Sequence, residues 1–436
     1  MMWTAVFFFS LLHCSRALPN LRERTKRERK GWPRSRRERF PNVEERVRLY
    51  MSNWYLPSCQ QKESSFAYRP LDESRVKIVG TNMTLSRDVT PDRVLWLKEE
   101  VVLDCARYDV DVDTDDSSAP YRVEFRKNMR MYCTDVVEVF DIVTHLDVES
   151  MPPVLAQFGD MRTSHEWGIV TIPHLKKFRS AAATPESLNK VTGSSSSCVK
   201  NRVALQTGHS QDSVVQPIVW KMATHRHYRH LPNVHRHDTP WDEKRDVAVW
   251  RGQLTGSIDY GYNKTATAMQ NCQNLPRCKL VYDTAKSPYV DAKLTNLKGR
   301  LPDVLDGVEL VGPSVTIREL MRHKGIVMVE GNDVASGLKW ALLSQSVVLM
   351  PKPKYTSWAM EELLQPWVHY IPLKDDITDV VEKMKWIVDN KDEARAIAER
   401  GTIWMEDLVF HPEASRDDRL IKEEILRRYS AHFRAA

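Results

Sequence analysis

Residues 324–372 read KGIVMVEGNDVASGLKWALLSQSVVLMPKPKYTSWAMEELLQPWVHYIP, and their pattern of apolar runs and turn residues predicts strands and a helix. Residues 325–329 form a short apolar, β-branched run, which is typical of a strand buried on both faces of a parallel sheet. Turn-forming residues 330–333 follow, then helical spacing over residues 335–343 and a second apolar run over residues 346–350. The pattern predicts a strand, a loop of small residues, a helix and a strand, joined as one βαβ unit.

The loop of this unit is a candidate phosphate site. A loop that enters a helix presents free backbone N–H groups and the positive end of the helix dipole, and a phosphate or diphosphate is their usual occupant. The stretch has too few glycines for a P-loop or a G-x-G-x-x-G fingerprint. An ordinary βαβ crossover without a ligand is therefore an equally good interpretation of this stretch alone.

A second loop of the same kind follows residues 246–250, which read DVAVW and predict a strand. Arg251, Gly252, Gln253 and Thr255 come directly after it. A guanidinium group matches phosphate oxygens in a bidentate manner, and glycine lets the backbone approach a ligand closely. We interpret these residues as a second phosphate-facing loop.

The chain between these two stretches alternates between strand and helix patterns. Residues 278–282 and 304–311 predict strands, and Ser314 is placed to cap a helix over residues 315–323. Such alternation predicts a parallel, doubly wound sheet.

Helical patterns dominate after the last predicted strand. One helix is expected over residues 377–388, and a second over residues 392–399 that stops at Gly401. Residues 420–429 predict an amphipathic helix that needs a surface to pack on.

Asp160 is a candidate catalytic residue in the first half of the chain. Residues 153–158 predict a buried strand that ends at Gly159 and Asp160. Open α/β sheets place their chemistry just beyond the carboxyl ends of the strands. A turn or helix-capping role explains Asp160 equally well at this point.

Two clusters invite a metal interpretation. Residues 109–116 contain D-x-D triplets, a pattern that can hold a divalent cation on a sugar nucleotide, but no apolar strand leads into them, which favours a solvated loop. Five histidines gather in a second patch: His225, His227, His230, His235 and His237. Their spacing matches neither H-E-x-x-H nor a closed tetrahedral site, which favours a partly protonated polar surface that lines a cleft for an anionic ligand.

Length and composition indicate a two-domain globular enzyme that enters the secretory pathway. The chain has 436 residues, 42% of them hydrophobic, with 13 tryptophans. Residues 1–17 combine an apolar run with small residues at Ser15 and Ala17, as a secretory signal does, and the run is too short to span a bilayer comfortably. We expect the lumen of the endoplasmic reticulum or Golgi, or secretion, and no other membrane-spanning segment.

The cysteines and sequons agree with an oxidising compartment. Six cysteines remain beyond Cys14: Cys59, Cys105, Cys133, Cys198, Cys272 and Cys278. They allow up to three disulfides in fifteen possible pairings, with buried thiols as the alternative. No C-x-x-C occurs, so the sequence gives no support for zinc binding through cysteine. Asn82 and Asn263 each begin an N-glycosylation sequon.

The positive charge of the chain is concentrated near its start. Residues 22–39 carry ten basic and three acidic side chains, so their net +7 exceeds the formal +6 of the whole chain. The remainder is near −1 and gives no charge-based case for nucleic-acid binding. The basic run predicts a solvated, disordered stem, with contact to anionic lipid, polysaccharide or RNA as the alternative.

Residues 324–405 resemble the C-terminal half of glycosyltransferase family 90, the capsule-associated-protein or Rumi-type enzymes. The motif LQPWVHYIP at residues 364–372 carries the resemblance, together with IAERG at residues 397–401 and WRG at residues 250–252. The resemblance implies an α/β protein of GT-B type, with two facing Rossmann-like domains and a C-terminal amphipathic helix.

The resemblance also implies a division of the chain. We expect a signal peptide over residues 1–17, a disordered basic stem over residues 18–46, an N-terminal acceptor-side domain over residues 47–210, a C-terminal sugar-nucleotide-binding domain over residues 211–410 and a helix over residues 411–436.

The activity implied by the resemblance is transfer of a hexose or pentose from a UDP-sugar to a protein or glycan hydroxyl, with inversion and without a metal or cofactor. Asp160 falls on the family's catalytic base. The expected donor-binding residues are Arg251, Gly252, Gln253, Thr255, Asn332, Asp333, Val334, Ala335, Ser336, Gly337 and Glu362. Glu362 is assigned to the ribose, although a glutamate at a helix start is also an ordinary dipole partner.

The chain departs from the family at two arginine positions and one serine position. The arginine expected shortly after the glycine motif falls near Asp259, the one that closes the donor loop is Gly337, and Gln253 stands where Rumi-type enzymes have serine. Both arginine losses remove phosphate contacts. These losses leave open an inactive relative that binds a glycan or nucleotide. The patch His225 to His237 and the acidic run 109–116 leave open a metal-dependent enzyme that uses one of them.

Overall fold

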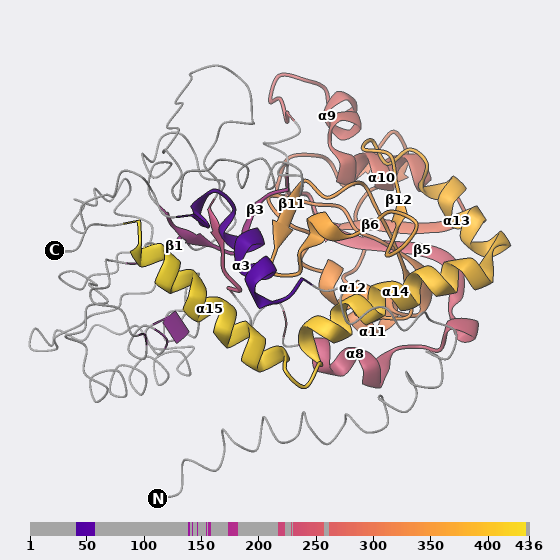
Figure 1. Ribbon diagram of the computed structural model, residues 1–436. Helices are drawn as coiled ribbons and strands as arrows, with labels where there is room; N and C mark the ends of the chain where they lie inside the picture. The colour runs from indigo at the N-terminus through magenta and orange to yellow at the C-terminus, as the bar shows by residue number, and fades with distance from the viewer. Residues whose placement is uncertain are drawn as a thin grey trace, which may run out of the picture.

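The computed structural model describes residues 41–56, 138–139, 142, 146, 154, 156–157, 173–181, 217–222, 228, 230–256 and 261–432 (Figure 1). The predicted signal peptide, most of the predicted basic stem, Asp160, the acidic run 109–116 and the loop position Asp259 lie outside these residues. In the described part of the chain, no helix is both long enough and apolar enough to cross a membrane.

A five-stranded parallel sheet forms the centre of the C-terminal half. Its strands in spatial order are β12 (Ile371–Pro372), β10 (Val347–Met350), β9 (His323–Val327), β5 (Arg245–Gln253) and β6 (Val290–Asn296). The apolar runs at residues 325–329 and 346–350 contribute to β9, which starts and ends two residues earlier than the first run, and to β10. The two strands pair directly, with Ile326 opposite Val348. The predicted parallel sheet is confirmed.

Both faces of the sheet are buried. Successive strand residues point to opposite sides of the sheet, so neighbouring residues enter different core clusters. Ala248, Val327 and Leu349 pack into one core cluster, whereas their neighbours Val249 and Ile326 pack into the other.

Helices cover each face of the sheet. On the side of Ala248 lie α9 (Ala268–Asn274), α10 (Pro276–Thr284) and α13 (Val380–Asp389). On the side of Val249 lie α8 (Leu231–His237) and α12 (Leu338–Leu343), whereas α14 (Lys391–Val409) packs its first half into the cluster of Ala248 and its second half into the cluster of Val249. The sheet is therefore wound on both faces, as the alternation of strands and helices predicted.

Three sequence predictions in this half were wrong. Residues 278–282 are helical, within α10, because Pro276 opens a helix whose residues Cys278 and Val281, three apart, are both buried. Residues 304–311 form a short hairpin of β7 (Val304–Leu305) and β8 (Val308–Glu309). The helix expected over residues 315–323 is a single turn, α11 (Ile317–Leu320), and its N-cap is Thr316 in place of Ser314.

Gly401 does not end a helix. Helix α14 runs through it to Val409. A Cβ atom at Gly401 would meet Leu342 Cδ2 at 3.0 Å and the His369 carbonyl oxygen at 3.1 Å. The glycine therefore serves close packing of α14 against α12, and it is not a C-terminal cap.

The N-terminal half contributes a small parallel sheet of β1 (Ala156–Gln157), β2 (Leu175–Lys176) and β4 (Ile218–Val219). Strand β4 lies beyond residue 210, so this sheet extends past the expected domain boundary. Helix α3 (Val43–Met51) begins inside the range expected to be a disordered stem, and Val47 and Met51 are fully buried. The GT-B arrangement of two facing domains stays a prediction, because most of residues 47–210 lie outside the described part.

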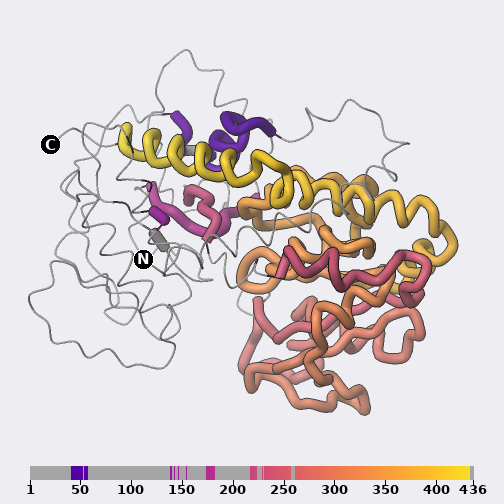
Figure 2. The backbone as a smooth tube through the Cα atoms, turned by 90° about the horizontal axis from the view of Figure 1, so that it is seen from below, coloured from indigo at the N-terminus to yellow at the C-terminus, as the bar shows by residue number. Residues whose placement is uncertain are grey.

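Two features connect the halves. Strand β3 (Phe178–Ser180) pairs with β11 (Tyr355–Ser357) in antiparallel register. The C-terminal helix α15 (Ala414–Ser430) packs against α3, and Figure 2 shows it running on from α14 across the N-terminal elements. Short 3₁₀ turns at Ser52–Trp54, Trp241–Glu243 and Glu361–Leu363 complete the described elements.

Candidate functional site

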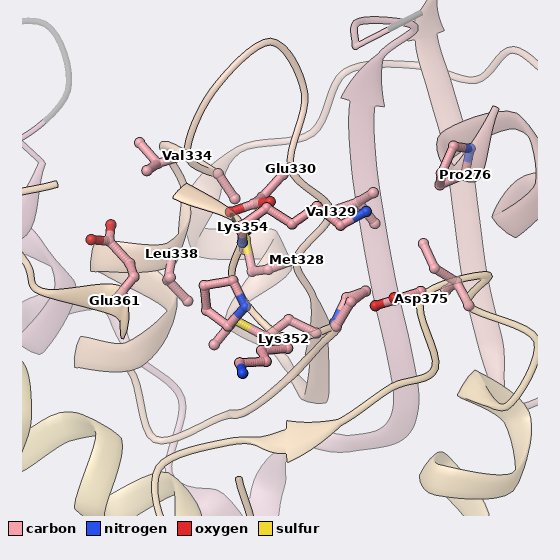
Figure 3. A pocket seen from close by; sticks show the side chains of 15 residues that line it. Pro276, Met328, Val329, Glu330, Val334, Leu338, Lys352, Lys354, Glu361 and Asp375 are labelled. Carbon is pink, nitrogen blue, oxygen red and sulfur yellow. Dashed lines mark hydrogen bonds between the residues drawn. The ribbon is translucent and has the colours of Figure 1, made fainter. Parts of the chain in front are cut away.

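A hollow lies beyond the carboxyl ends of β9 and β10, and its empty space of about 470 Å³ includes open solvent at its mouth (Figure 3). Met328, Leu338 and Met350 give it an apolar floor, whereas Glu330 and Lys354 bring charge to it. Lys352 and Asp375 add two more charged side chains to the lining. An apolar depression with a few charged groups, at this edge of a parallel sheet, is the usual form of a ligand site in α/β proteins.

The loop 331–337, predicted to contact a phosphate, borders this hollow, but its side chains have different roles from those expected. Val334 and Ala335 line the hollow. The Asn332 side-chain oxygen accepts the Gly256 N–H at 2.8 Å, and Asp333 pairs with Lys177 at 2.7 Å. Asn332 and Asp333 therefore hold the loop against other segments, and Ser336 is exposed.

The helix after this loop begins later than expected. Residues 335–337 are not helical, and α12 covers only Leu338–Leu343, with Gly337 at its N-cap. A Cβ atom at Gly337 would meet Trp340 Nε1 at 3.1 Å and Met328 Cε at 3.3 Å. An arginine, the residue expected here from the family, would require these neighbours to move.

Arg251 does not project into a loop. Strand β5 continues through Gln253, and the Arg251 guanidinium pairs with the Asp291 carboxylate at 2.9 Å and also donates to the Asp291 carbonyl oxygen at 2.9 Å. At Gly252, a Cβ atom would meet the Trp250 ring at 2.6 Å. Residues 251–253 are therefore strand and not loop, and Arg251 supports the pairing of β5 with β6. Donor binding by Arg251, Gly252, Gln253 and Thr255 stays a prediction.

Glu362, expected to hold a ribose, is instead part of a buried ion pair. Its Oε2 accepts from Arg179 Nη1 at 3.0 Å, and Oε1 accepts from Nη2. The two side chains are 4% and 0% exposed. Burial raises the pKa of Glu362 to about 7 even though Arg179 opposes the shift. Glu362 therefore connects β3 to the turn after β11, and a ribose would have to displace Arg179.

Arg277 is the residue of this site that the sequence did not indicate. Its Nη1 donates to the Gln253 carbonyl at 2.8 Å and to the Thr255 hydroxyl at 2.7 Å, and its Nη2 donates to the Val329 carbonyl at 2.7 Å. One guanidinium thus joins the chain segments that leave β5 and β9.

Arg277 also fits against a glycine of the loop. A Cβ atom at Gly331 would meet Arg277 Nη2 at 2.8 Å and would also collide with Thr255 Oγ1. Arg277 lies in the first turn of α10, and the disulfide Cys272–Cys278 closes the chain around it. The proline and the paired cysteines around Arg277 were the available signal, which was missed because residues 278–282 were interpreted as a strand.

Glu330 ties the same loop to the segment after β10. Its carboxylate accepts the backbone N–H groups of Lys354 and Tyr355, each at 3.2 Å. Burial raises the pKa of Glu330 from its ordinary 4.5 to about 8. Beside it, Lys339 and Glu361 form a pair at 2.6 Å in which both side chains are 1% exposed.

The histidine patch does not come together as a metal site in the described residues. Among them, no group of three or more histidine, cysteine, aspartate or glutamate side chains is arranged to hold an ion. His235 packs against the Phe410 ring at 5.2 Å, and burial lowers its pKa to about 4. His230 and His237 are exposed, and His225 and His227 lie outside the described part.

Residues 227–411 match the family model for glycosyl transferase family 90. This segment belongs to family 90. The resemblance drawn from the motifs at residues 250–252 and 364–372 is thereby confirmed. The hollow, Arg277 and the loop that Arg277 holds all lie within this family-90 segment.

Three relatives show the extent of the likeness. The O-glucosyltransferase LpsA of Dichelobacter nodosus is 38% identical over 91 residues, which are 21% of this chain and 29% of the relative. Protein O-glucosyltransferase 2 of Danio rerio is 31% identical over 189 residues, 41% of this chain and 33% of the relative. Protein O-glucosyltransferase 3 of Homo sapiens is 35% identical over 92 residues, 21% of this chain and 18% of the relative. The chain thus matches a third or less of the length of each.

Proposed function

We propose that this protein transfers a hexose or pentose from a UDP-sugar to a hydroxyl group of a protein or glycan, with the donor in the hollow at the carboxyl edge of the five-stranded sheet. The observation that carries the proposal is the family-90 segment, which contains this hollow with its apolar floor and charged rim. Because two of the similar proteins are named protein O-glucosyltransferases, UDP-glucose is the first donor to test.

Transfer from a nucleotide sugar requires stabilisation of the departing diphosphate. Lys352 and Lys354 supply cationic side chains at the hollow, and Val334 and Ala335 bring backbone to it. Arg277 contributes indirectly, because it fixes Val329, at the rim of the hollow, to the end of β5. The helix α12 adds little dipole, since it has only six residues.

The acceptor hydroxyl must lose its proton as it attacks the sugar. We propose Asp160 as the base, on the family resemblance, in a single inverting displacement that uses no metal. The proposed compartment is the lumen of the secretory pathway, which agrees with the disulfide Cys272–Cys278 and with the signal peptide expected at residues 1–17.

A second candidate is a family relative that binds a nucleotide or glycan without turnover. It is favoured by the pairing of Arg251 with Asp291, which engages an arginine expected at the diphosphate, and by Gly337, where the family has another arginine.

One experiment separates these candidates. The purified chain is incubated with a panel of UDP-hexoses and UDP-pentoses, with and without EDTA, and release of UDP is measured together with donor binding. We expect turnover that EDTA does not change, that Asp160→Asn abolishes, and that the exposed control Asp242→Asn preserves. Donor binding without turnover would establish the second candidate, and loss of turnover in EDTA would overturn the metal-independent mechanism.

A further inference from the structure

We propose that Asn263 is an N-glycosylation site of this protein and carries an oligosaccharide transferred from a lipid diphosphate donor. Asn263, Lys264 and Thr265 form the sequon, and all three residues are exposed. They lie in the connection between β5 and α9, and Figure 1 shows α9 at the periphery of the fold. This inference does not depend on the proposed transferase activity.

The geometry of the sequon suits the chemistry. The Asn263 side-chain oxygen accepts two hydrogen bonds from Thr265, one from its backbone N–H at 2.9 Å and one from its hydroxyl at 2.8 Å. Both contacts use the oxygen of the amide, and within the described residues no hydrogen bond engages Asn263 Nδ2. The nitrogen that would carry the sugar therefore faces solvent with its hydrogens available.

The proposed glycan transfer forms one bond and breaks one bond, and both the proton and the leaving group are accounted for. Asn263 Nδ2 forms a bond to the anomeric carbon of the first sugar, and the bond from that carbon to the lipid diphosphate breaks. The proton lost from Nδ2 passes to a base of the transferring enzyme, and the lipid diphosphate leaves as an anion. This protein contributes only the acceptor amide and the threonine hydroxyl.

The turn that presents the sequon is anchored to the fold from beneath. The Asn263 N–H donates to the Asn271 side-chain oxygen at 2.9 Å, and Asn271 Nδ2 donates back to the Asn263 carbonyl at 2.8 Å. Asn271 is 3% exposed, so the backbone of the sequon is held by a buried group while its side chain points outward. A Thr267–Gln270 capping box then starts α9. Among the residues that the structure describes, a glycan on Asn263 would project from this turn without displacing a packed side chain.

A second covalent feature points to the compartment in which N-glycans are attached. Cys272 and Cys278 form a disulfide in the helices that follow the same turn. Disulfides of this kind form in the oxidising lumen of the secretory pathway, which is also where the lipid-linked donor is used. The two modifications should therefore be found on the same molecules.

The test uses the full chain secreted from a eukaryotic cell, with the other sequon removed by Asn82→Gln. Peptide-N-glycosidase treatment in heavy-oxygen water, followed by peptide mass spectrometry, should convert Asn263 into labelled aspartate in most molecules, and the protein should migrate faster on a gel after treatment. Asn263→Gln and Thr265→Ala should each abolish both signals. Thr265→Ser, which keeps a hydroxyl, should retain them.

The wild-type peptide map keeps the inference testable even if a variant folds poorly. Secreted protein that contains the Cys272–Cys278 disulfide but an unmodified Asn263 peptide would overturn it. Retention of the chain in the cytosol would overturn it as well. UDP-sugar turnover measured on the same preparation reports on the proposed function separately, because the Asn82→Gln chain should keep whatever turnover the wild type has.

Discussion

The loop that borders the hollow is held in two different ways on its two sides. On the side of β5, Arg277 donates to backbone carbonyls and a threonine hydroxyl, so one cation is shared among neutral acceptors. On the side of β3, cations meet carboxylates: Lys177 pairs with Asp333 and Arg179 pairs with Glu362, all with little exposure. The Arg277 contacts are thus between a charge and neutral groups, whereas the Lys177 and Arg179 contacts, which join the two halves, are between opposite charges.

This difference predicts that removal of a single side chain has different effects on stability at the two sides. Removal of one member of a buried ion pair leaves its partner charged without compensation, which costs more than the pair contributed. Removal of a cation from neutral acceptors loses hydrogen bonds but leaves no buried charge. The junction between the halves should therefore be more sensitive to single substitutions and to pH than the contacts of Arg277.

The largest effect is expected from Arg179→Ala. Glu362 would be left buried without its partner, and the free energy of unfolding, measured by urea titration, should fall by about 3–5 kcal/mol. The double variant Arg179→Met/Glu362→Leu should recover part of this loss because no unpaired charge remains. Arg322→Ala, which removes the surface pair with Glu319, should change stability by less than about 1 kcal/mol. Equal losses for Arg179 and Arg322 would contradict the distinction between buried and surface pairs.

The next effect concerns pH. The pKa of Glu330 is raised by burial from 4.5 to about 8, so the folded protein holds this proton more tightly than the unfolded chain does. Its contribution to stability is therefore complete below pH 4.5 and is lost as the pH rises through about 8. Glu330→Gln keeps an oxygen acceptor for the Lys354 and Tyr355 N–H groups but does not titrate. Between pH 5 and 8 the unfolding free energy of the wild type should fall relative to this variant by about 3–4 kcal/mol.

Thermal and urea unfolding at several pH values would measure that difference. The exposed substitution Glu382→Gln is the control and should leave the pH dependence of the wild type unchanged. Parallel pH profiles for the wild type and Glu330→Gln would show that Glu330 is not held in its protonated form.

A smaller effect is expected from Arg277→Gln. The variant loses the hydrogen bonds by which Arg277 joins the ends of β5 and β9. Hydrogen bonds to a charged group of this kind contribute about 2 kcal/mol of free energy, so their loss should leave the loop 331–337 less well positioned. In a donor-turnover assay, that loss should appear as a roughly 10- to 30-fold fall in kcat/KM, carried mainly by KM for the UDP-sugar. Arg318→Gln, at an exposed position, should have no effect. A change confined to melting temperature would show that Arg277 stabilises the fold without positioning the donor.

The smallest effect is expected from the disulfide next to Arg277. Closing so short a loop contributes about 2 kcal/mol in the chain-entropy model, with less in practice where the reduced chain stays ordered. Cys272→Ser/Cys278→Ser should therefore lower the unfolding free energy by up to that amount and weaken donor binding through the first turn of α10. Unchanged donor KM in this variant, alongside a raised KM in Arg277→Gln, would show that α10 holds Arg277 without the disulfide.

The fold of the C-terminal half could be predicted from sequence because its information is local. The apolar runs at residues 325–329 and 346–350 are bounded by turn residues, they supply the end of β9 and all of β10, and a parallel sheet is the arrangement that buries both faces of such strands. The short apolar run at residues 278–282 does not distinguish a strand from a helix, because five residues are too few to show a clear period. In the folded protein, tertiary packing makes this run helical.

The site was predicted less well because side-chain partners are distant in sequence. The position of loop 331–337 beside the hollow followed from the βαβ pattern. The partner of Glu362 lies 183 positions away, and that of Arg251 lies 40 positions away on the next strand. No local pattern distinguishes an arginine that faces a ligand from one that is paired across a sheet, and only the folded arrangement assigned Arg251, Glu362 and Arg277 to their roles.

The packing of α15 on α3 has a consequence for synthesis of the chain. Arg428 donates to the Tyr55 carbonyl across 373 positions, and its guanidinium lies 4.1 Å from the centre of the Tyr55 ring. Helix α3 therefore emerges from the ribosome long before α15, the helix that covers it. The apolar face of α3 stays without this cover until almost all the remaining residues have been synthesised. During that interval, α3 depends on other segments or on a chaperone to stay out of aggregates, and folding is completed only when α15 closes over it.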